Sequence, residues 1–201
     1  MSGKKNILMI GCGSIGSWTS LCLSRTNFFN LFLQDFDVFE EKNIKGQFVT
    51  TDLIGKKKPE ALKILCQRFN NYDSITPIVT KFNERSNVAP ITLAVTDNII
   101  SRKTACMKWL ALPSKELFID ARLTNTDLRI YVLTKNTEKE IIDEHLNNMY
   151  PDDKTIDDNI VCTISQSTYC GATIGGYITS KVLQYLSGIE PEYATEINLV
   201  F

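Results

Sequence analysis

Three glycines near the start of the chain form a turn motif of the kind that binds phosphate. Gly11, Gly13 and Gly16 stand in the pattern G-x-G-x-x-G, directly after the apolar run at residues 6–10. Glycines at this spacing allow a tight turn and a close approach of the backbone to a phosphate group. A helix beginning at the turn would also direct its N-terminus at an anion. The motif therefore predicts a nucleotide-binding site.

A carboxylate follows the second apolar run of the chain. Asp35 ends the run at residues 31–35, which we predict to be the second strand. At the carboxyl end of such a strand, a carboxylate can accept hydrogen bonds from the hydroxyl groups of a ribose. Up to this point, an NAD-dependent reductase and an ATP-dependent enzyme fit the sequence equally well.

The polar residues that follow Asp35 separate these two interpretations, because a dinucleotide-binding enzyme has no need of them. Taken singly, each has a simple structural explanation. An aspartate at a strand end often caps the next helix, and the lysines at 56–58 could form a solvated helix face. As an ordered set they are more specific: Asp35, Asp37, Asn43, Gly46, Gln47, Lys56, Lys58, Asp97, Asn98 and Arg102.

In this order, the set resembles the ThiF/MoeB family, which belongs to the superfamily of ubiquitin-activating enzymes. The resemblance runs from about Ile7 to Ser187. It implies an adenylyltransferase that uses ATP and Mg²⁺ to activate the C-terminal carboxylate of a ubiquitin-like or sulfur-carrier protein ending in glycine. It also implies a homodimer and, as a further partner, a downstream conjugating protein.

The resemblance also implies roles for single residues. Asp35 would hold the ribose, while Asn43 and Lys58 would reach the triphosphate, where an ammonium group offsets the charge of the transferring oxygens. Asp97 would carry the magnesium ion, and Arg102 would act in catalysis near the same loop, with Lys58. The other nucleotide-binding positions implied in this way are Gly11, Gly13, Gly16, Asp37, Gln47 and Asn98.

One position departs from the family pattern. The family segment usually ends in N-x-x-R-Q, with the arginine on the phosphates, whereas this chain has Gly46 in place of the arginine. Lys45 is the neighbouring cation and our candidate for its catalytic role, although it lacks the two-pronged contact of a guanidinium. Arg85, Arg122 or a second subunit are the alternatives. We also expect Gly46 to occupy a turn that needs a positive φ.

The cysteines do not form a zinc site by their spacing. Six are present, and none belongs to a C-x-x-C pair, so zinc is not expected. Four lie in apolar or helical contexts, where a buried and unreactive thiol is the usual outcome. These four are Cys12, Cys22, Cys66 and Cys106.

Cys162 is the candidate for a thioester step. It resembles the loop cysteine with which several family members receive the activated carboxylate. A helix that is rich in small residues follows it, as in those members. The acidic run at 152–158 would raise the pKa of this thiol, which argues against reactivity. Cys170 is a weaker candidate, and His145, the one histidine, is expected to be a solvated helix residue and not a base.

The elements that must position these residues alternate along the chain. Predicted strands cover 6–10, 31–35, 75–82, 91–97, 116–123 and 127–134, and predicted helices 14–26, 58–70 and 101–112. This order favours a doubly wound, Rossmann-like α/β fold with a mostly parallel sheet. Residues 127–134 come too soon for a helical crossover, so we expect antiparallel additions in the C-terminal half. An acidic crossover segment at about 136–167 should hold a short helix and a mobile loop.

Composition narrows the classes of partner. Lysine plus arginine number 22 against 23 for aspartate plus glutamate, so no overall field attracts nucleic acid or an anionic membrane. No apolar run reaches the ~18 residues that span a bilayer. We therefore expect a cytoplasmic protein. Its length favours a single domain over residues 1–201, and the resemblance implies that this is an ATP-binding adenylation domain.

Three alternatives stay open. One is an adenylyltransferase without a thioester step, acting on a peptide or a tRNA base. Another is a non-catalytic subunit of a heterodimeric activating enzyme, although such a scaffold would have no physical need of Asp97 and Lys58. The last is the NAD-dependent reductase, which would bind NADH and ignore ATP.

Overall fold

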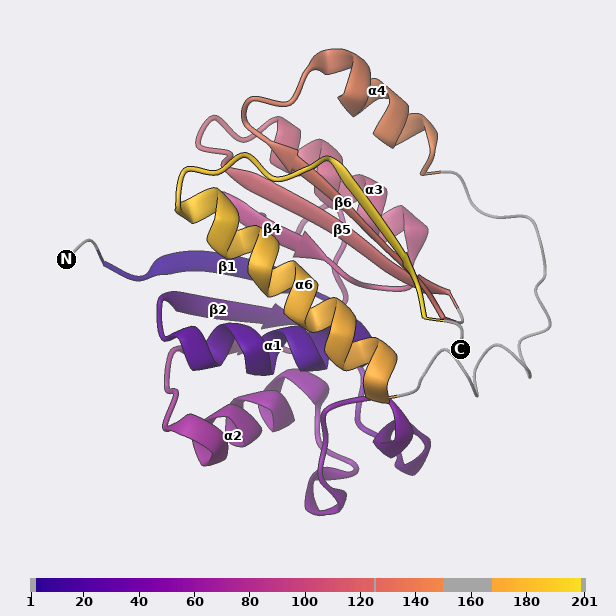
Figure 1. The fold of residues 1–201 in the computed structure, drawn as a ribbon. Helices are drawn as coiled ribbons and strands as arrows, with labels where there is room; N and C mark the ends of the chain where they lie inside the picture. The colour runs from indigo at the N-terminus through magenta and orange to yellow at the C-terminus, as the bar shows by residue number, and fades with distance from the viewer. Residues whose placement is uncertain (1–2, 125, 150–167, 200–201) are drawn as a thin grey trace.

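The strands of the protein form one mixed sheet, with α1 and α6 in front of it in the ribbon of Figure 1. The computed structural model describes residues 3–124, 126–149 and 168–199. Within these residues the strand order is β3-β2-β1-β4-β5-β6-β7. The strands are β1 (Lys5–Ile10), β2 (Phe29–Gln34), β3 (Ile75–Ile78), β4 (Ile91–Ala94), β5 (Leu117–Thr124), β6 (Asp127–Thr134) and β7 (Ala194–Asn198).

The pairing of the strands confirms the predicted fold class. Neighbours from β3 to β5 are parallel, whereas β6 and β7 are added antiparallel at the C-terminal edge. Some expectations about strands were wrong in detail. β3 ends at Ile78 and β4 at Ala94, each sooner than predicted, because the polar residues after them leave the sheet. In addition, β7 was not predicted. Its residues are alternately exposed and half-buried, so it lacks the apolar run that marks an inner strand.

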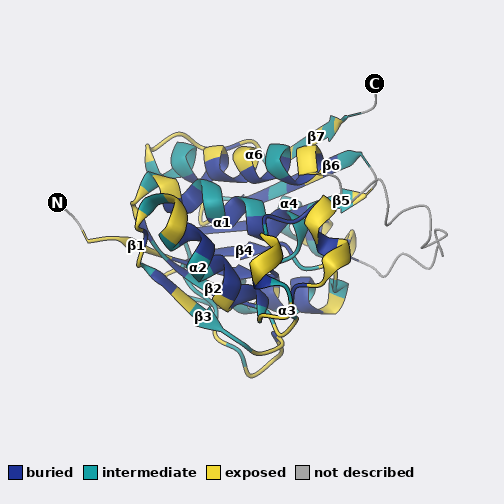
Figure 2. Cartoon of the chain, turned by 90° about the horizontal axis from the view of Figure 1, so that it is seen from below, coloured by how far each residue is buried: buried dark blue, intermediate teal, exposed yellow. Residues whose placement is uncertain are grey.

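Helices cover both faces of the sheet (Figures 1 and 2). The α-helices are α1 (Ser14–Thr26), α2 (Lys58–Asn70), α3 (Ile99–Leu110), α4 (Lys139–Asn147) and α6 (Thr168–Leu186), with short 3₁₀ helices at Glu41–Lys45 and Thr51–Leu53. Among the described residues, no helix combines the length and the apolar character that crossing a bilayer requires.

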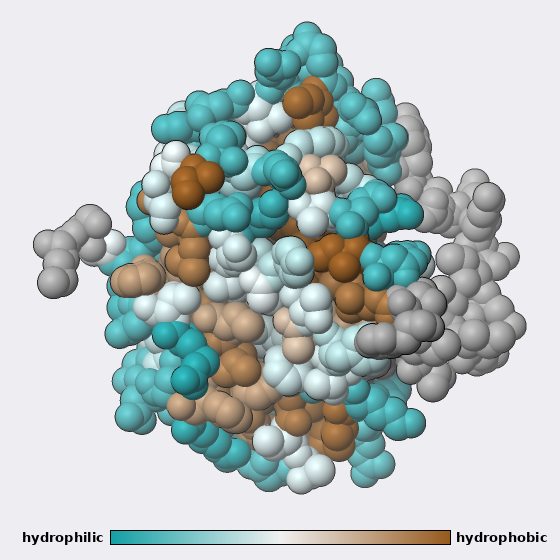
Figure 3. Space-filling view, in the orientation of Figure 1, coloured by the Kyte–Doolittle hydropathy of each residue, from teal (hydrophilic) through white to brown (hydrophobic). Residues whose placement is uncertain are grey.

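Two apolar cores hold the layers together. Alternate residues of β1 point to opposite faces, so Ile7 and Met9 join the core beneath α1, α2 and α6, while Leu8 and Ile10 join the core beneath α3 and α4. Figure 2 shows the buried residues gathered between the helices and the sheet. The outer face of α6 exposes Thr168, Gly176 and Ser180 together with the rings of Tyr169 and Tyr177, and residues of intermediate hydropathy give the pale surface at the centre of Figure 3.

The sheet places its loops so that a crevice opens beside β1. The chain runs outward from β1 to β2 and β3, then returns to place β4 on the other side of β1. The loops that follow β1 and β4 therefore diverge at the carboxyl ends of these strands, where doubly wound sheets bind ligands.

Two of the motif glycines are required by this geometry. Gly11 has φ +103°, and a Cβ there would lie 2.8 Å from the backbone nitrogen of Thr96. A Cβ on Gly16 would lie 2.1 Å from the carbonyl oxygen of Gly11. The glycines thus let α1 start close against the turn and let the turn touch the loop after β4.

A second glycine contact joins α6 to α1. A Cβ on Gly175 would lie 2.9 Å from the backbone nitrogen of Thr19, and one on Gly171 would lie 2.6 Å from the ring of Trp18. The two helices therefore pack at a separation that a larger side chain would not allow. This packing brings the first residues of α6 to the segment at 45–46.

The adjacent glycines of α6 give a matched test of this packing. We predict that Gly175→Ala lowers the free energy of unfolding by about 1–3 kcal/mol, because its Cβ meets the backbone of α1. Gly176→Ala meets nothing within 4 Å and should instead raise it by about 0.5–1 kcal/mol through helix propensity. Urea denaturation of both variants checks the prediction, and equal effects would contradict it.

Candidate functional site

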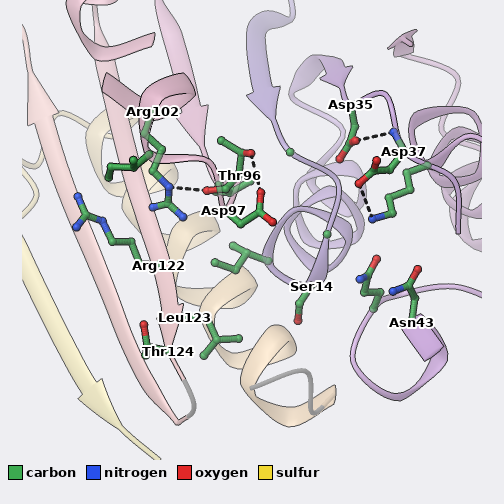
Figure 4. A pocket seen from close by; sticks show the side chains of 17 residues that line it. Ser14, Asp35, Asp37, Asn43, Thr96, Asp97, Arg102, Arg122, Leu123 and Thr124 are labelled. Carbon is green, nitrogen blue, oxygen red and sulfur yellow. Dashed lines mark hydrogen bonds and ion pairs between the residues drawn. The ribbon is translucent and has the colours of Figure 1, made fainter. Parts of the chain in front are cut away.

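An open cleft of about 670 Å³ lies at the carboxyl ends of β1, β2, β4 and β5 (Figure 4). Its size falls within the range of small-molecule sites, roughly 300–1,000 Å³. Backbone and side chains from five parts of the chain line it: Gly11, Gly13, Ser14, Ile15, Asp35, Asp37, Asn43, Gln47, Lys58, Val95, Thr96, Asp97, Ile99, Arg102, Arg122, Leu123 and Thr124.

The N-terminus of α1 forms one side of the cleft. Gly13 is the N-cap residue of this helix. Because glycine has no side chain, the first backbone N–H groups of the helix receive no side-chain cap. A Cβ on Gly13 would meet nothing within 4 Å, so the turn faces open space here. The first turn of α1 carries no acidic residue that would occupy the site. Its positive end is therefore directed at the cleft, where it favours an anion.

Asp35 ties the turn after β1 to the turn after β2. Its Oδ2 accepts a hydrogen bond from the backbone nitrogen of Cys12 at 2.7 Å, and its Oδ1 accepts one from the backbone nitrogen of Asp37 at 2.9 Å. A carboxylate can accept about four hydrogen bonds, so these two leave capacity toward the cleft. The ribose contact predicted for Asp35 is compatible with this position and stays a prediction.

Lys58 brings a nearly buried cation to the cleft. It begins α2 and is 8% exposed, and its Nζ lies 3.5 Å from the Oδ2 of Asp37. The ammonium also lies over the ring of Phe39, 5.9 Å from its centre. These neighbours hold the ammonium at the wall of the cleft.

Two amide side chains of the segment after β2 also line the cleft. Asn43 accepts a hydrogen bond from the backbone nitrogen of Glu40 at 2.9 Å, which closes a capping box over the 3₁₀ helix Glu41–Lys45. Gln47 is 7% exposed, and its Oε1 has no hydrogen-bond partner among the described residues. An unsatisfied buried group costs about 1–3 kcal/mol, so a ligand group that donates a hydrogen bond to this oxygen would be favoured.

The segment at Gly46 differs from expectation. Its φ is −134°, so the positive φ that we predicted is wrong. The carbonyl oxygen of Gly46 accepts hydrogen bonds from Ser14 Oγ at 3.1 Å and Trp18 Nε1 at 3.0 Å. The neighbouring Lys45 is exposed and does not line the cleft, and its carbonyl oxygen accepts a hydrogen bond from Thr168. The glycine thus lies in a tight junction between α1 and α6.

The loop after β4 places two predicted residues differently. Asp97 is exposed, lines the cleft and lies between its two sides in Figure 4. Asn98 caps α3 by accepting a hydrogen bond from the backbone nitrogen of Ser101 at 2.9 Å, and it is not among the residues lining the cleft. Lys56 is likewise exposed outside the cleft.

Of the cations proposed to replace the missing arginine within this chain, Arg122 lines the cleft, whereas Arg85 and Lys45 do not. Arg122 extends from the end of β5, beside Leu123 and Thr124. Arg102 also lines the cleft but is 6% exposed and points into the fold. Burial lowers the pKa of Arg102, and the nearby Asp120 opposes this shift.

Asp120, which the sequence analysis did not select, connects both arginines. It is fully buried, and its carboxylate accepts hydrogen bonds from Arg102 Nη1 at 2.5 Å and Arg122 Nη2 at 2.7 Å. The available signal was a charged residue inside the apolar strand segment LFIDARL, because a buried carboxylate requires a partner.

His145 was expected to be solvated, and this was wrong. It is 1% exposed, with its Nδ1 3.3 Å from the hydroxyl of Tyr193 and its Nε2 3.8 Å from Asp120. The apolar residues Ile141 and Ile142 precede it at helical spacing, so α4 turns this face inward. Burial lowers the pKa of His145 to about 4.

The cysteines fall into three groups. Cys12, Cys66 and Cys106 are fully buried, Cys22 is partly buried, and burial raises the pKa of each thiol. Cys170 is buried within α6. Cys162, the predicted thioester residue, lies outside the described residues.

The fold and the cleft define a class: a doubly wound α/β protein with a candidate ligand site at its switch point, where a helix N-terminus, buried amides and cations meet. Comparison with known families narrows this class. The ThiF family model matches residues 3–200, so the chain belongs to the ThiF family.

Two curated relatives are similar to this chain along most of its length. It is 25% identical over 207 residues to ubiquitin-like modifier-activating enzyme 5 of Aedes aegypti, covering 91% of this chain and 51% of that protein. The enzyme of the same name from Drosophila willistoni is 24% identical over 207 residues, covering 91% and 50%. The chain thus spans about half the length of the curated relatives it matches.

Solved structures share the fold at lower identity. E. coli MccB with ATP superposes with a TM-score of 0.73 at 18% identity, covering 96% of this chain and 60% of that one. MccB with selenomethionine MccA gives 0.74 at 18%, covering 97% and 61%. PaaA gives 0.72 at 17%, also covering 97% and 61%.

The burial of His145 predicts acid sensitivity. Its pKa of about 4 in the folded protein compares with 6.5 for an unperturbed histidine, so the unfolded chain binds the proton more readily between these values. The free energy of unfolding should therefore be fully present above pH 6.5 and fall by about 3 kcal/mol by pH 4, at about 1.4 kcal/mol per pKa unit.

Urea denaturation at stepped pH measures this dependence. His145 is the one histidine of the chain, so His145→Phe should flatten the curve between pH 4.5 and 6.5. A variant with the same slope as the natural protein would show that another group titrates.

Proposed function

We propose that this protein is an ATP-dependent adenylyltransferase that activates a terminal carboxylate of a small protein or peptide. The observation that carries the proposal is the gathering, in one cleft, of a helix N-terminus, the nearly buried ammonium of Lys58 and the side-chain amides of Asn43 and Gln47. Two of the solved neighbours were determined with ATP or with MccA, and the curated relatives are named for activating ubiquitin-like modifiers. These names support the proposal by analogy.

In this proposal, different residues of the cleft contact different parts of the nucleotide. Asp35, at the end of β2, is placed to accept hydrogen bonds from a ribose. The amide groups that begin α1 would surround the phosphates, with Lys58 and the side chains of Asn43 and Gln47 toward the β- and γ-phosphates. Lys58 would supply a point charge there, and the NH2 groups of the two amides would donate directed hydrogen bonds to phosphate oxygens.

The reaction is a displacement at the α-phosphorus of ATP. A carboxylate oxygen of the substrate forms the new P–O bond, the bond to the β-phosphate breaks, and pyrophosphate leaves with the electron pair. An ionised carboxylate has no proton to give up, so the chain needs no general base. Its contribution is to align the reactants and to offset the charge of the leaving group.

Asp97 is the residue that would hold magnesium. No group of three or more histidine, cysteine or acidic side chains suited to a metal occurs among the described residues. Magnesium bound with a nucleotide needs only one or two protein carboxylates, because phosphates and water complete its shell. The exposed carboxylate of Asp97 in the cleft fits this requirement. When bound, the ion would offset phosphate charge.

The finer assignments rest on the family. We propose a ubiquitin-like or sulfur-carrier protein ending in glycine as the substrate, with Cys162 as the acceptor of the activated carboxylate and a conjugating protein downstream. A homodimer is also expected, since two-fold assemblies are common; sedimentation as a monomer at tens of micromolar would contradict it.

Of the alternatives, an adenylyltransferase without a thioester step retains every role given to the cleft. A non-catalytic subunit would have no use for Lys58 at the wall of an open cleft, because a buried ammonium is costly to keep. An NAD-dependent reductase needs neither Lys58 nor Gln47.

Substitutions at two lysines distinguish a specific contact with the nucleotide from a general effect of surface charge on ATP affinity. We predict that Lys58→Ala weakens ATP binding about tenfold to a hundredfold, the equivalent of one charge-assisted hydrogen bond. Lys56→Ala removes an exposed lysine outside the cleft and should leave the affinity within twofold. Calorimetry with ATP and with NADH measures both; tight NADH binding without ATP binding would favour the reductase.

The activity itself is tested by exchange of labelled pyrophosphate into ATP, with candidate small proteins that end in glycine as substrates. We predict that Asp97→Ala abolishes the exchange and leaves the fold intact, since Asp97 is exposed. Asp143→Ala, which removes an exposed carboxylate of α4, is the control. Exchange by Asp97→Ala within a few-fold of the natural protein would remove Asp97 from the site.

A further inference from the structure

A buried carboxylate in β5 organises two arginines at the cleft. Asp120 is fully buried, and its Oδ1 accepts a hydrogen bond from Arg102, while its Oδ2 accepts two from Arg122, at 2.7 Å from Nη2 and 3.2 Å from Nε. His145, 3.8 Å away, is neutral at pH 7 because burial lowers its pKa to about 4. The cluster of one carboxylate and two guanidinium groups thus has a formal charge of +1.

The guanidinium of Arg122 is held in one orientation. Two of its nitrogens bind the same carboxylate oxygen, and its central carbon lies over the ring of Tyr131, 5.4 Å from the ring centre. Arg102 is held separately, by Thr96 and Ala121 carbonyl oxygens as well as by Asp120. The Arg122 side chain remains 24% exposed and lines the cleft. A cation fixed in this way binds an anion at a smaller entropic cost than a mobile one.

Arg122 lies across the cleft from the groups assigned to the nucleotide. In Figure 4, Arg122 and Thr124 lie on one side and Asp35 and Asn43 on the other, with Asp97 between them. In a phosphoryl transfer, the attacking and leaving oxygens lie roughly in line, on opposite sides of phosphorus. If pyrophosphate leaves on the side of Asn43, the attacking carboxylate must enter from the side of β5.

We infer that Arg122 binds the terminal carboxylate of the substrate and that Asp120 is the positioning residue that holds Arg122 in place. This inference rests on the adenylation proposed above and names the group that receives its second substrate. A planar guanidinium matches a carboxylate. Leu123 and Thr124, which continue the same wall, would contact the last residues of the substrate chain. A phosphate of ATP is the other anion that Arg122 could bind, and the experiment separates the two.

The test compares two probes by calorimetry on the full chain. One is ATP, and the other is 5′-O-(N-glycylsulfamoyl)adenosine, a stable mimic of an acyl adenylate that retains the acyl carbonyl group. Arg122→Gln should weaken binding of the mimic at least tenfold and leave the affinity for ATP within threefold. The control is Arg129→Gln, because Arg129 is the cross-strand partner of Arg122 on β6 but does not line the cleft. It should change neither affinity.

Asp120→Asn tests the positioning role. Asparagine keeps the size of the side chain and one acceptor oxygen but removes the charge that holds Arg122. We expect the affinity for the mimic to fall at least fivefold relative to that for ATP, whereas a purely structural defect would lower both affinities together. Circular dichroism establishes whether this variant folds; if it does not, Arg122→Gln alone decides.

Three results would overturn the inference. Arg122→Gln could weaken ATP as much as the mimic, which would make Arg122 a phosphate ligand, or it could change neither affinity. The natural protein could bind ATP but not the mimic. If the natural protein binds neither probe, the adenylation proposed above fails and this inference falls with it, which is distinguishable from a selective failure at Arg122.

Discussion

The close approach of backbone segments at the glycine turn is the constraint on which the site depends. A Cβ on Gly11 would lie 2.8 Å from the Thr96 backbone, and one on Gly16 would lie 2.1 Å from the Gly11 carbonyl oxygen. These contacts fix the start of α1 against β1 and hold the loop after β4 beside it. Asp35 attaches the turn after β2 to the glycine turn, because its carboxylate accepts a hydrogen bond from the backbone nitrogen of Cys12. One turn thereby sets the relative positions of a helix N-terminus and the carboxylates on either side of it.

The same arrangement brings carboxylates and cations together in the cleft, where their charges balance. Three carboxylates line it, Asp35, Asp37 and Asp97, and so do three cations, Lys58, Arg102 and Arg122. Each side keeps local pairs: Lys58 lies near Asp37, and both arginines bind the buried Asp120. A polyanion entering the cleft would therefore meet cations that the protein already holds in position, and its binding would need little reorganisation.

The sequence predicted well those helices and strands whose formation depends on neighbouring residues in the chain. The helices 14–26 and 58–70 and the strand 127–134 occur with the bounds that periodicity and capping indicated. The sequence analysis also selected most residues of the cleft, because they follow strand ends at one edge of a parallel sheet. It missed Asp120 and misjudged His145, since the pairing of a buried carboxylate or the inward face of a short helix depends on tertiary packing. Likewise, β7 is an edge strand stabilised by its partner β6 more than by its own composition.

The backbone at position 46 is a packing contact. Its carbonyl oxygen receives hydrogen bonds from Ser14 and Trp18, and a Cβ on Gly171 of α6 would already lie 3.1 Å from that oxygen. In this chain, the position where the family usually carries an arginine is thus a contact point between the first helix and the last described one. Of the cations considered for that role within this chain, Arg122, near the end of β5, is the one that lines the cleft, and it does so from the opposite side. Moving a cation from the segment after β2 to β5 would move it from the leaving group toward the attacking one, because the two lie in line across phosphorus. The departure from the family pattern is thereby compatible with a working site whose charges are distributed differently.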